Sequence, residues 1–207
     1  MVAVGLAGSR LLVGAASAGG WDDFGPDRRV TRADGATVLT LDDEPALSVY
    51  RRYLGPFAAE LPGSALLFPL ALRRQGTDTP IVRTILGVDE EAGSLRFAGE
   101  VPEGALVRLM RSDTDRLLDG AGDAARRAGR AAHTRTPSLV LCVSCVGRRA
   151  VMRSQVDEEL EEVQAAYGNA VLTGFYSNGE IGPNGAESPI DTVLHNQTMT
   201  VTLMAEA

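Results

Sequence analysis

The spacing of apolar residues predicts three helices. After Pro45, apolar side chains recur every three or four residues as far as Tyr53, and Gly55 follows as a stop signal. Residues 112–132 carry an apolar face made mostly of alanine, with arginines near the C-terminal end. Residues 153–167 carry an apolar face opposite an acidic one. The alanine-rich face indicates a helix that lies close against a sheet.

Short apolar runs bounded by Gly, Pro and Asp predict strands elsewhere. Two of them flank Asp34-Gly35, a pair that suits a tight hairpin turn. Because strands and helices are clustered and do not alternate, we predict an α+β fold, with a mixed or largely antiparallel sheet and about three helices on its faces. The predicted strands are residues 28–32, 36–41, 65–72, 80–88, 94–99, 105–112, 139–146, 170–176 and 199–204.

The first twenty residues are apolar and end near a sequence that imitates a signal-peptidase site. No Lys or Arg precedes this run, however, and Arg10 interrupts it. We therefore interpret residues 2–7 and 11–16 as strands, interpret residues 21–26 as a turn, and expect a cytoplasmic protein.

Composition and charge narrow the classes of partner. The chain has 207 residues, 44% of them apolar, which is typical of a globular protein with ample core. Its net charge of −7 and its lack of a basic stripe argue against a nucleic-acid partner. No run of about 18 uncharged apolar residues occurs, so we expect no membrane span.

Two cysteines, Cys142 and Cys145, lie in one apolar run. Residues three apart in a strand point to opposite faces, so these two should not form a disulfide with each other. A single CxxC motif, with His133 and His195 far away in the sequence, is a poor zinc signature. We expect two free thiols, no metal and no cofactor.

Residues 174–201 hold the best candidates for binding chemistry. A turn-rich segment with Gly179, Gly182 and Gly185 lies between two predicted strands, and polar groups stand at the mouths of both. A carboxylate there could hold a ligand ammonium group, and carboxamides both donate and accept hydrogen bonds. Alternatively, these groups satisfy the amides of their own turn. The candidates are Glu180, His195, Asn196 and Gln197, with His195 and Gln197 expected on one face of a strand.

The end of the run at 139–146 offers two further candidates. Arg148 could bind a carboxylate with its guanidinium fork, or pair with the acidic cluster at 158–162 on the surface. Cys145 could be a buried apolar group, or a nucleophile with His195 and Glu180. We see no helix start directly after Cys145 that would lower its pKa, and therefore do not favour an enzyme.

Four blocks resemble the C-terminal domain of the FIST family (F-box and intracellular signal transduction proteins). They are SCVGR at 144–148, EELEEV at 158–163, GFYSNGEIGP at 174–183 and LHNQTMTV at 194–201. Residues 19–47 resemble the closing part of the FIST N-terminal domain, which suggests domains at 1–44 and 45–207. The resemblance implies a sensory module for a small polar ligand, with amino acids as suggested ligands, and Tyr176 in its third block joins the candidate ligand contacts.

Two other functions stay open at this stage. One is a module that recruits a protein partner through strand edges and loops, and the other is a cysteine-dependent hydrolase. The resemblance lacks the first part of the N-terminal domain, so we expect a strand near residues 2–7 or 11–16 to lack a neighbour. Such an edge would favour a homodimer, or a separate chain that supplies the missing half.

Overall fold

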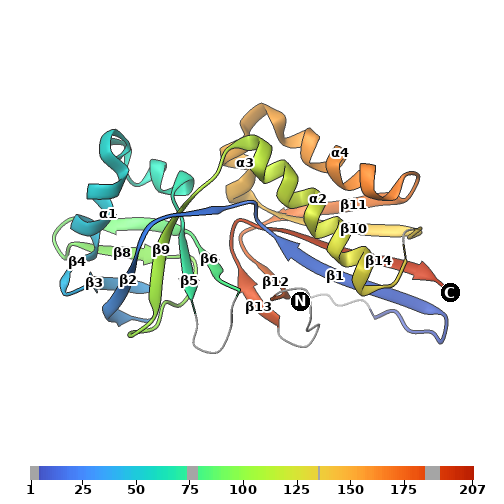
Figure 1. Cartoon of the computed structure of the whole chain (residues 1–207), viewed down its shortest axis with the longest axis horizontal. Coiled ribbons are helices and arrows are strands. Elements are labelled where there is room, and N and C mark those ends of the chain that lie inside the picture. The colour runs from blue at the N-terminus through green and yellow to red at the C-terminus, as the bar shows by residue number, and fades with distance from the viewer. Residues whose placement is uncertain (1–4, 74–78, 135, 185–191) are drawn as a thin grey trace.

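The computed structural model describes residues 5–73, 79–134, 136–184 and 192–207. Two lobes lie side by side, each built on its own sheet (Figure 1). Antiparallel strands dominate, with one parallel pair, and helices cover sheet faces, so the predicted α+β class is confirmed. The predicted turn residue Gly185 lies outside the described residues.

The first lobe holds a curled sheet in the order β6-β5-β9-β2-β3-β8-β7, with β4 paired to β3. The helix α1 (Ala46–Leu54), predicted from its apolar spacing, packs against this sheet through its buried face. Gly35, at φ 54°, makes the predicted tight turn between β2 and β3. The strands are β2 (Asp22–Asp34), β3 (Thr37–Leu41), β4 (Glu44–Pro45), β5 (Leu70–Arg73), β6 (Ile81–Arg83), β7 (Ile85–Asp89), β8 (Ser94–Phe97) and β9 (Leu106–Arg111).

Three local predictions in this lobe are wrong. Residues 80–88 are not one strand, because β6 ends at Arg83 and β7, at the opposite end of the sheet order, begins at Ile85. Residues 21–26 are not a turn, because β2 already begins at Asp22 and accommodates Gly25-Pro26 in an irregularity between Phe24 and Arg28. Residues 65–72 are not one strand either. The 3-10 helix η2 (Gly63–Leu67) occupies the first half, after η1 (Gly55–Glu60), and the strand β5 starts only beyond Pro69, which cannot donate to a ladder.

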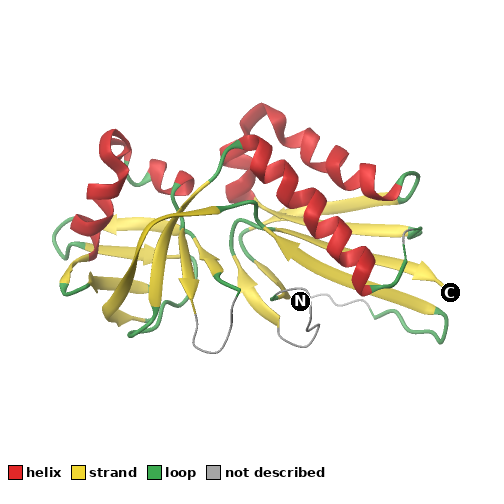
Figure 2. Cartoon of the chain, in the orientation of Figure 1, coloured by secondary structure: helices red, strands yellow, loops and turns green. Residues whose placement is uncertain are grey.

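The second lobe holds a four-stranded sheet in the order β1-β14-β10-β11. The helices α2 and α4 cover one face of it, and the hairpin of β12 and β13 lies toward the first lobe (Figure 2). The elements are β1 (Leu11–Ala18), α2 (Thr114–Ala131), β10 (Leu139–Cys145), α3 (Val146–Met152), η3 (Arg153–Gln155), α4 (Val156–Tyr167), β11 (Val171–Ser177), β12 (Glu180–Pro183), β13 (Thr192–His195) and β14 (Met199–Glu206).

The chain before β2 contributes to the second lobe. β1 pairs with β14 and, among the described strands, lies at one edge of the sheet, as expected for a strand near residues 11–16. Residues 5–7 form no strand, and residues 1–4 lie outside the described part. Residues 1–44, which we expect to belong to one sequence domain, therefore contribute strands to both lobes.

The alanine face of α2 lies directly on β1, as its composition predicts. Ala121, Ala125 and Ala128 are fully buried in the core of this lobe. A Cβ atom placed on Gly14 of β1 would lie 2.1 Å from the Ala128 carbonyl oxygen. The close approach therefore requires small residues on both elements.

We expect Gly14→Ala to lower the free energy of unfolding by about 1–3 kcal/mol, because the added methyl group forces α2 away from the sheet. Val13→Ala is the matched control, since Val13 is half exposed. Urea unfolding of both variants measures the difference. Equal losses in the two variants would show that the contact between Gly14 and α2 is not tight.

Candidate functional site

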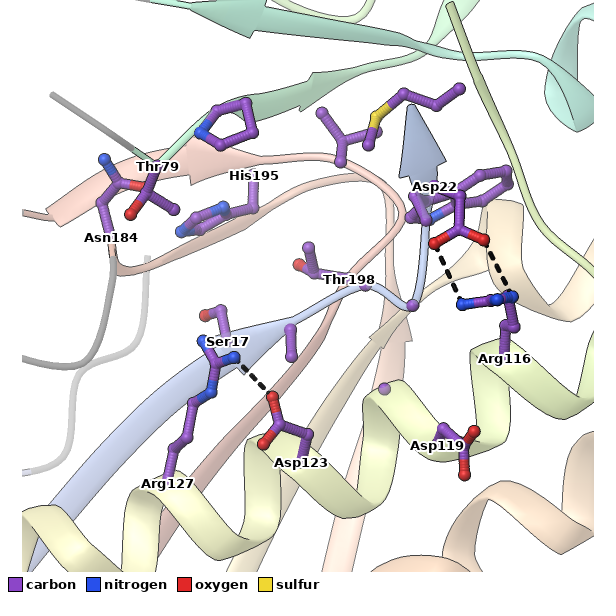
Figure 3. Close-up of a pocket in the computed structure, with 18 of the residues that line it drawn as sticks. Ser17, Asp22, Thr79, Arg116, Asp119, Asp123, Arg127, Asn184, His195 and Thr198 are labelled. Carbon is purple, nitrogen blue, oxygen red and sulfur yellow. Dashed lines mark hydrogen bonds and ion pairs between the residues drawn. The ribbon is translucent and has the colours of Figure 1, made fainter. Parts of the chain in front are cut away.

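A cavity of about 550 Å³ lies between the two lobes. Its walls come from the end of β1 and the residues after it, from α2, from the start of β6, and from the β12–β13 hairpin with the segment that follows (Figure 3). The described lining residues are Ser17, Ala18, Gly19, Gly20, Trp21, Asp22, Thr79, Pro80, Val82, Met110, Arg116, Asp119, Gly120, Asp123, Arg126, Arg127, Asn184, His195 and Thr198.

The α2 wall carries positive and negative side chains in balance. Three aspartates and three arginines line the cavity, all but one of them from α2. Arg116 Nε lies 2.8 Å from Asp22 Oδ2, and Arg127 Nη2 lies 2.6 Å from Asp123 Oδ2. Because these pairs are partly exposed, they are weak and can exchange partners with a ligand.

The hairpin wall presents hydrogen-bonding groups of another kind. Asn184 is 8% exposed, and its Oδ1 atom has no hydrogen-bond partner among the described residues. His195 is buried, with Nε2 3.1 Å from the Pro183 carbonyl oxygen. Figure 3 shows both side chains across the cavity from Asp123 and Arg127.

The segment from His195 to Thr198 is not the regular strand start that we predicted. β13 ends at His195, and Gln197 has a φ of 54°, so the chain turns before β14 begins at Met199. All four side chains are buried as a result. Trp21 Nε1 donates to the Gln197 carbonyl oxygen at 2.9 Å, which ties this turn to the segment after β1.

Glu180 lies behind the cavity wall and does not line it. It is the first residue of β12 and is 3% exposed, and its carboxyl accepts hydrogen bonds from Ser177 Oγ and, at 3.0 Å, from Thr198 Oγ1. Burial raises the pKa of this carboxyl, and the hydrogen bonds only partly oppose that effect. Glu180 therefore positions Thr198, which does line the cavity.

We expect Glu180→Gln to gain stability relative to the wild type as the pH rises. The pKa of the Glu180 carboxyl is higher in the folded state than in the unfolded state, so the folded state holds this proton more tightly. The stability gained from that proton is fully present below the unfolded-state pKa and is lost as the pH rises through the folded-state pKa. Glutamine carries no charge at any pH. Urea unfolding from about pH 4 to about pH 8 measures the trend. A variant that loses stability relative to the wild type as the pH rises, or keeps a constant difference, would contradict the assignment.

Arg148 is fully buried and pairs with Glu159 of the acidic cluster at 158–162, which is the second alternative drawn from the sequence. Its Nε and Nη2 atoms lie 2.6 and 2.5 Å from Glu159 Oε1, within the core and not on the surface. Nη1 donates to the Gly19 carbonyl oxygen at 2.5 Å, and Nη2 donates to the Leu117 carbonyl oxygen at 2.7 Å. These partners occupy the guanidinium group, which joins α4 to the cavity walls at Gly19 and α2.

Cys145 is directly followed by a helix, contrary to our sequence interpretation, because α3 begins at Val146. The pKa of the Cys145 thiol is nevertheless raised, first by burial and then by the nearby Glu180 carboxyl. A raised pKa disfavours the thiolate that a cysteine nucleophile requires. Both Cys142 and Cys145 are free and buried.

The remaining candidates lie apart from this cavity. Asn196 accepts a hydrogen bond from the Thr84 amide at 3.3 Å, and Gln197 Nε2 donates to the Leu66 carbonyl oxygen at 3.2 Å, so both hold the two lobes together. Tyr176 is 39% exposed on β11, with the Arg149 guanidinium 5.2 Å from its ring centre. Of the seven predicted site residues, only His195 lines the cavity.

Two other features are absent from the described part of the chain. No group of three or more His, Cys, Asp or Glu side chains there could hold a metal ion. No helix there is both long enough and apolar enough to cross a membrane.

The structure is an α+β fold of two lobes with a polar cavity between them. The family models identify it further: the FIST C domain matches residues 46–183 and the FIST N domain matches residues 1–44. The chain belongs to the FIST family.

Curated relatives and solved structures add less information about function than the family models do. An uncharacterized protein of Mycobacterium bovis is 28% identical over 189 residues, which cover 86% of this chain and 46% of that protein. An uncharacterized protein of Mycobacterium tuberculosis is 28% identical over 185 residues, which cover 86% of this chain and 47% of that protein. The chain thus spans about half the length of these relatives. No solved structure matches it significantly.

Proposed function

We propose that this FIST protein is a sensory, non-enzymatic domain that binds a small zwitterionic ligand, such as an amino acid, in the cavity between its lobes. The observation that carries the proposal is a wall with equal numbers of Asp and Arg side chains that faces, across the cavity, the buried Asn184 carbonyl oxygen, which has no partner among the described residues. A buried acceptor without a partner is costly, and a ligand donor would remove that cost.

The charges favour a zwitterion over a simple anion or cation. Arg127 supplies a guanidinium for a ligand carboxylate, while Asn184 Oδ1 accepts from a ligand ammonium group. Asp123 keeps Arg127 in place before the ligand binds. The cavity volume lies within the range of small-molecule sites.

Glu180, Asn196, Gln197 and Arg148 serve this proposal as supports of the walls. A site between two lobes is sensitive to their relative position, and these side chains bridge the elements that form its walls. Ligand binding at the junction can therefore be transmitted as a change in how the lobes meet, which is what a sensor requires.

A thermal-shift screen tests the proposal with the free amino acids, their methyl esters and the matching acids without an amino group. We expect the unfolding temperature to rise with at least one free amino acid and to rise less with its ester and its deaminated form, because each of these lacks one charge. Equal shifts with all three forms, or none with any amino acid, would reject a zwitterion site.

A partner-recruiting module is a second candidate, supported by one observation. β11 is the other edge of the four-stranded sheet, and Val171 and Phe175 on it are 63% and 62% exposed. An exposed apolar edge strand can pair with another chain. Self-association through β1, expected from the sequence, stays a prediction, and light scattering at high protein concentration measures it.

A further inference from the structure

A second cavity, of about 390 Å³, lies on the other side of the segment from His195 to Thr198. Asn196 lines this cavity, whereas its neighbours His195 and Thr198 line the first. Residues of both lobes form its wall, and none of them is charged. They are Leu66, Thr84, Leu86, Ala98, Cys145, Val146, Gly147, Ala150, Asn178 and Asn196.

One polar group in this wall has no partner. Thr84 is 5% exposed, and its Oγ1 atom makes no hydrogen bond to any described residue. Its amide is already bound to Asn196 Oδ1, so the side chain is held in place beside the carboxamide. A hydroxyl group buried in this way gains from a partner that enters the cavity.

The other end of the cavity wall is apolar and open. Leu86 and Val146 are 51% and 44% exposed, one from each lobe. Cys145, also in the wall, stays uncharged because burial raises the pKa of its thiol. A charged ligand would lose its hydration here without gaining an opposite charge.

We propose that the second cavity binds a neutral amphipathic small molecule, with its hydrogen-bonding group at Thr84 and its apolar part between Leu86 and Val146. The site does not depend on the zwitterion site, since the two cavities share no lining residue. Thr84 and Asn196 recognise the polar end of the molecule, and Leu66, Leu86 and Val146 cover the rest.

Binding of benzamide and phenol as neutral probes, with benzoate and benzylamine as charged analogues, tests the proposal by nuclear magnetic resonance titration. We expect the neutral probes to shift the backbone amide signals of Thr84, Gly147 and Asn196, and to bind at least fivefold more tightly than the charged ones. Binding of the charged probes with equal affinity, or no shift of these three signals, would overturn the proposal.

Two variants and one control locate the probe. Thr84→Val should weaken benzamide binding about two- to twelvefold, the loss expected for one neutral hydrogen bond. Ala150→Trp, at an exposed wall position, should block benzamide binding without disturbing the core. Thr79→Val, in the wall of the first cavity, should leave the affinity for benzamide unchanged. Unchanged benzamide affinity in folded Ala150→Trp would place the probe elsewhere and contradict the proposal.

Discussion

Replacing Arg148 by methionine should lower the free energy of unfolding by about 3–5 kcal/mol, the largest effect that we expect from a single substitution. Removing one member of a buried ion pair leaves the other charge without compensation. Glu159, 1% exposed, would then keep only its hydrogen bond from Ser144 Oγ. The carbonyl oxygens of Gly19 and Leu117 would lose a donor as well. Urea unfolding of the variant and the wild type measures the loss.

Two controls separate the charge from the packing. Arg148→Lys keeps the charge but cannot reach all the partners of a planar guanidinium group. Its free energy of unfolding should therefore lie between those of Arg148→Met and the wild type. The double variant Arg148→Met with Glu159→Leu should recover part of the loss, because neither charge is then left unpaired. A loss below about 1 kcal/mol in Arg148→Met would mean that this ion pair does not hold the lobe together.

The second large effect concerns ligand binding. We expect Arg127→Gln to weaken binding of the zwitterionic ligand by about 1.5–3 kcal/mol, the range for a hydrogen bond to a charged group. Arg130→Gln is the matched control, because Arg130 follows Arg127 on α2, in the last turn of the helix, but does not line the cavity. Isothermal titration with the amino acid that gives the largest thermal shift measures both variants. Equal losses in the two would indicate a general effect of charge and not a contact.

The sequence predicts α2 and the strands β10, β11 and β14 of the second lobe well, and for local reasons, but it does not predict α3, β12 or β13. The alanine face of α2 and its Asp113 cap, which accepts from the Arg116 amide at 2.9 Å, depend on spacing within one helix. The same holds for the turn at Gly35, whose conformation follows from two residues. Patterns of this kind can be interpreted without knowledge of distant contacts.

The candidate cavity could not be predicted in the same way. Asn184 and Arg127 are far apart in the sequence and face each other across the cavity only because the β12–β13 hairpin lies across from α2. The alternation of Asp and Arg along α2 was the available signal, but an exposed helix face gives the same pattern. Likewise, nothing local distinguishes the buried pair of Arg148 and Glu159 from a surface pair. Their burial depends on Gly19 and Leu117, which approach from other elements.

Native mass spectrometry of the purified protein tests the central claim most directly, because a ligand held in the cavity between the lobes survives gentle desolvation as added mass. We expect the wild type to carry a small-molecule adduct, or to take one up from a mixture of free amino acids. Arg127→Gln should lose that adduct and Arg130→Gln should keep it. Wild-type protein that takes up no amino acid, or an adduct equally strong in Arg127→Gln, would contradict the account.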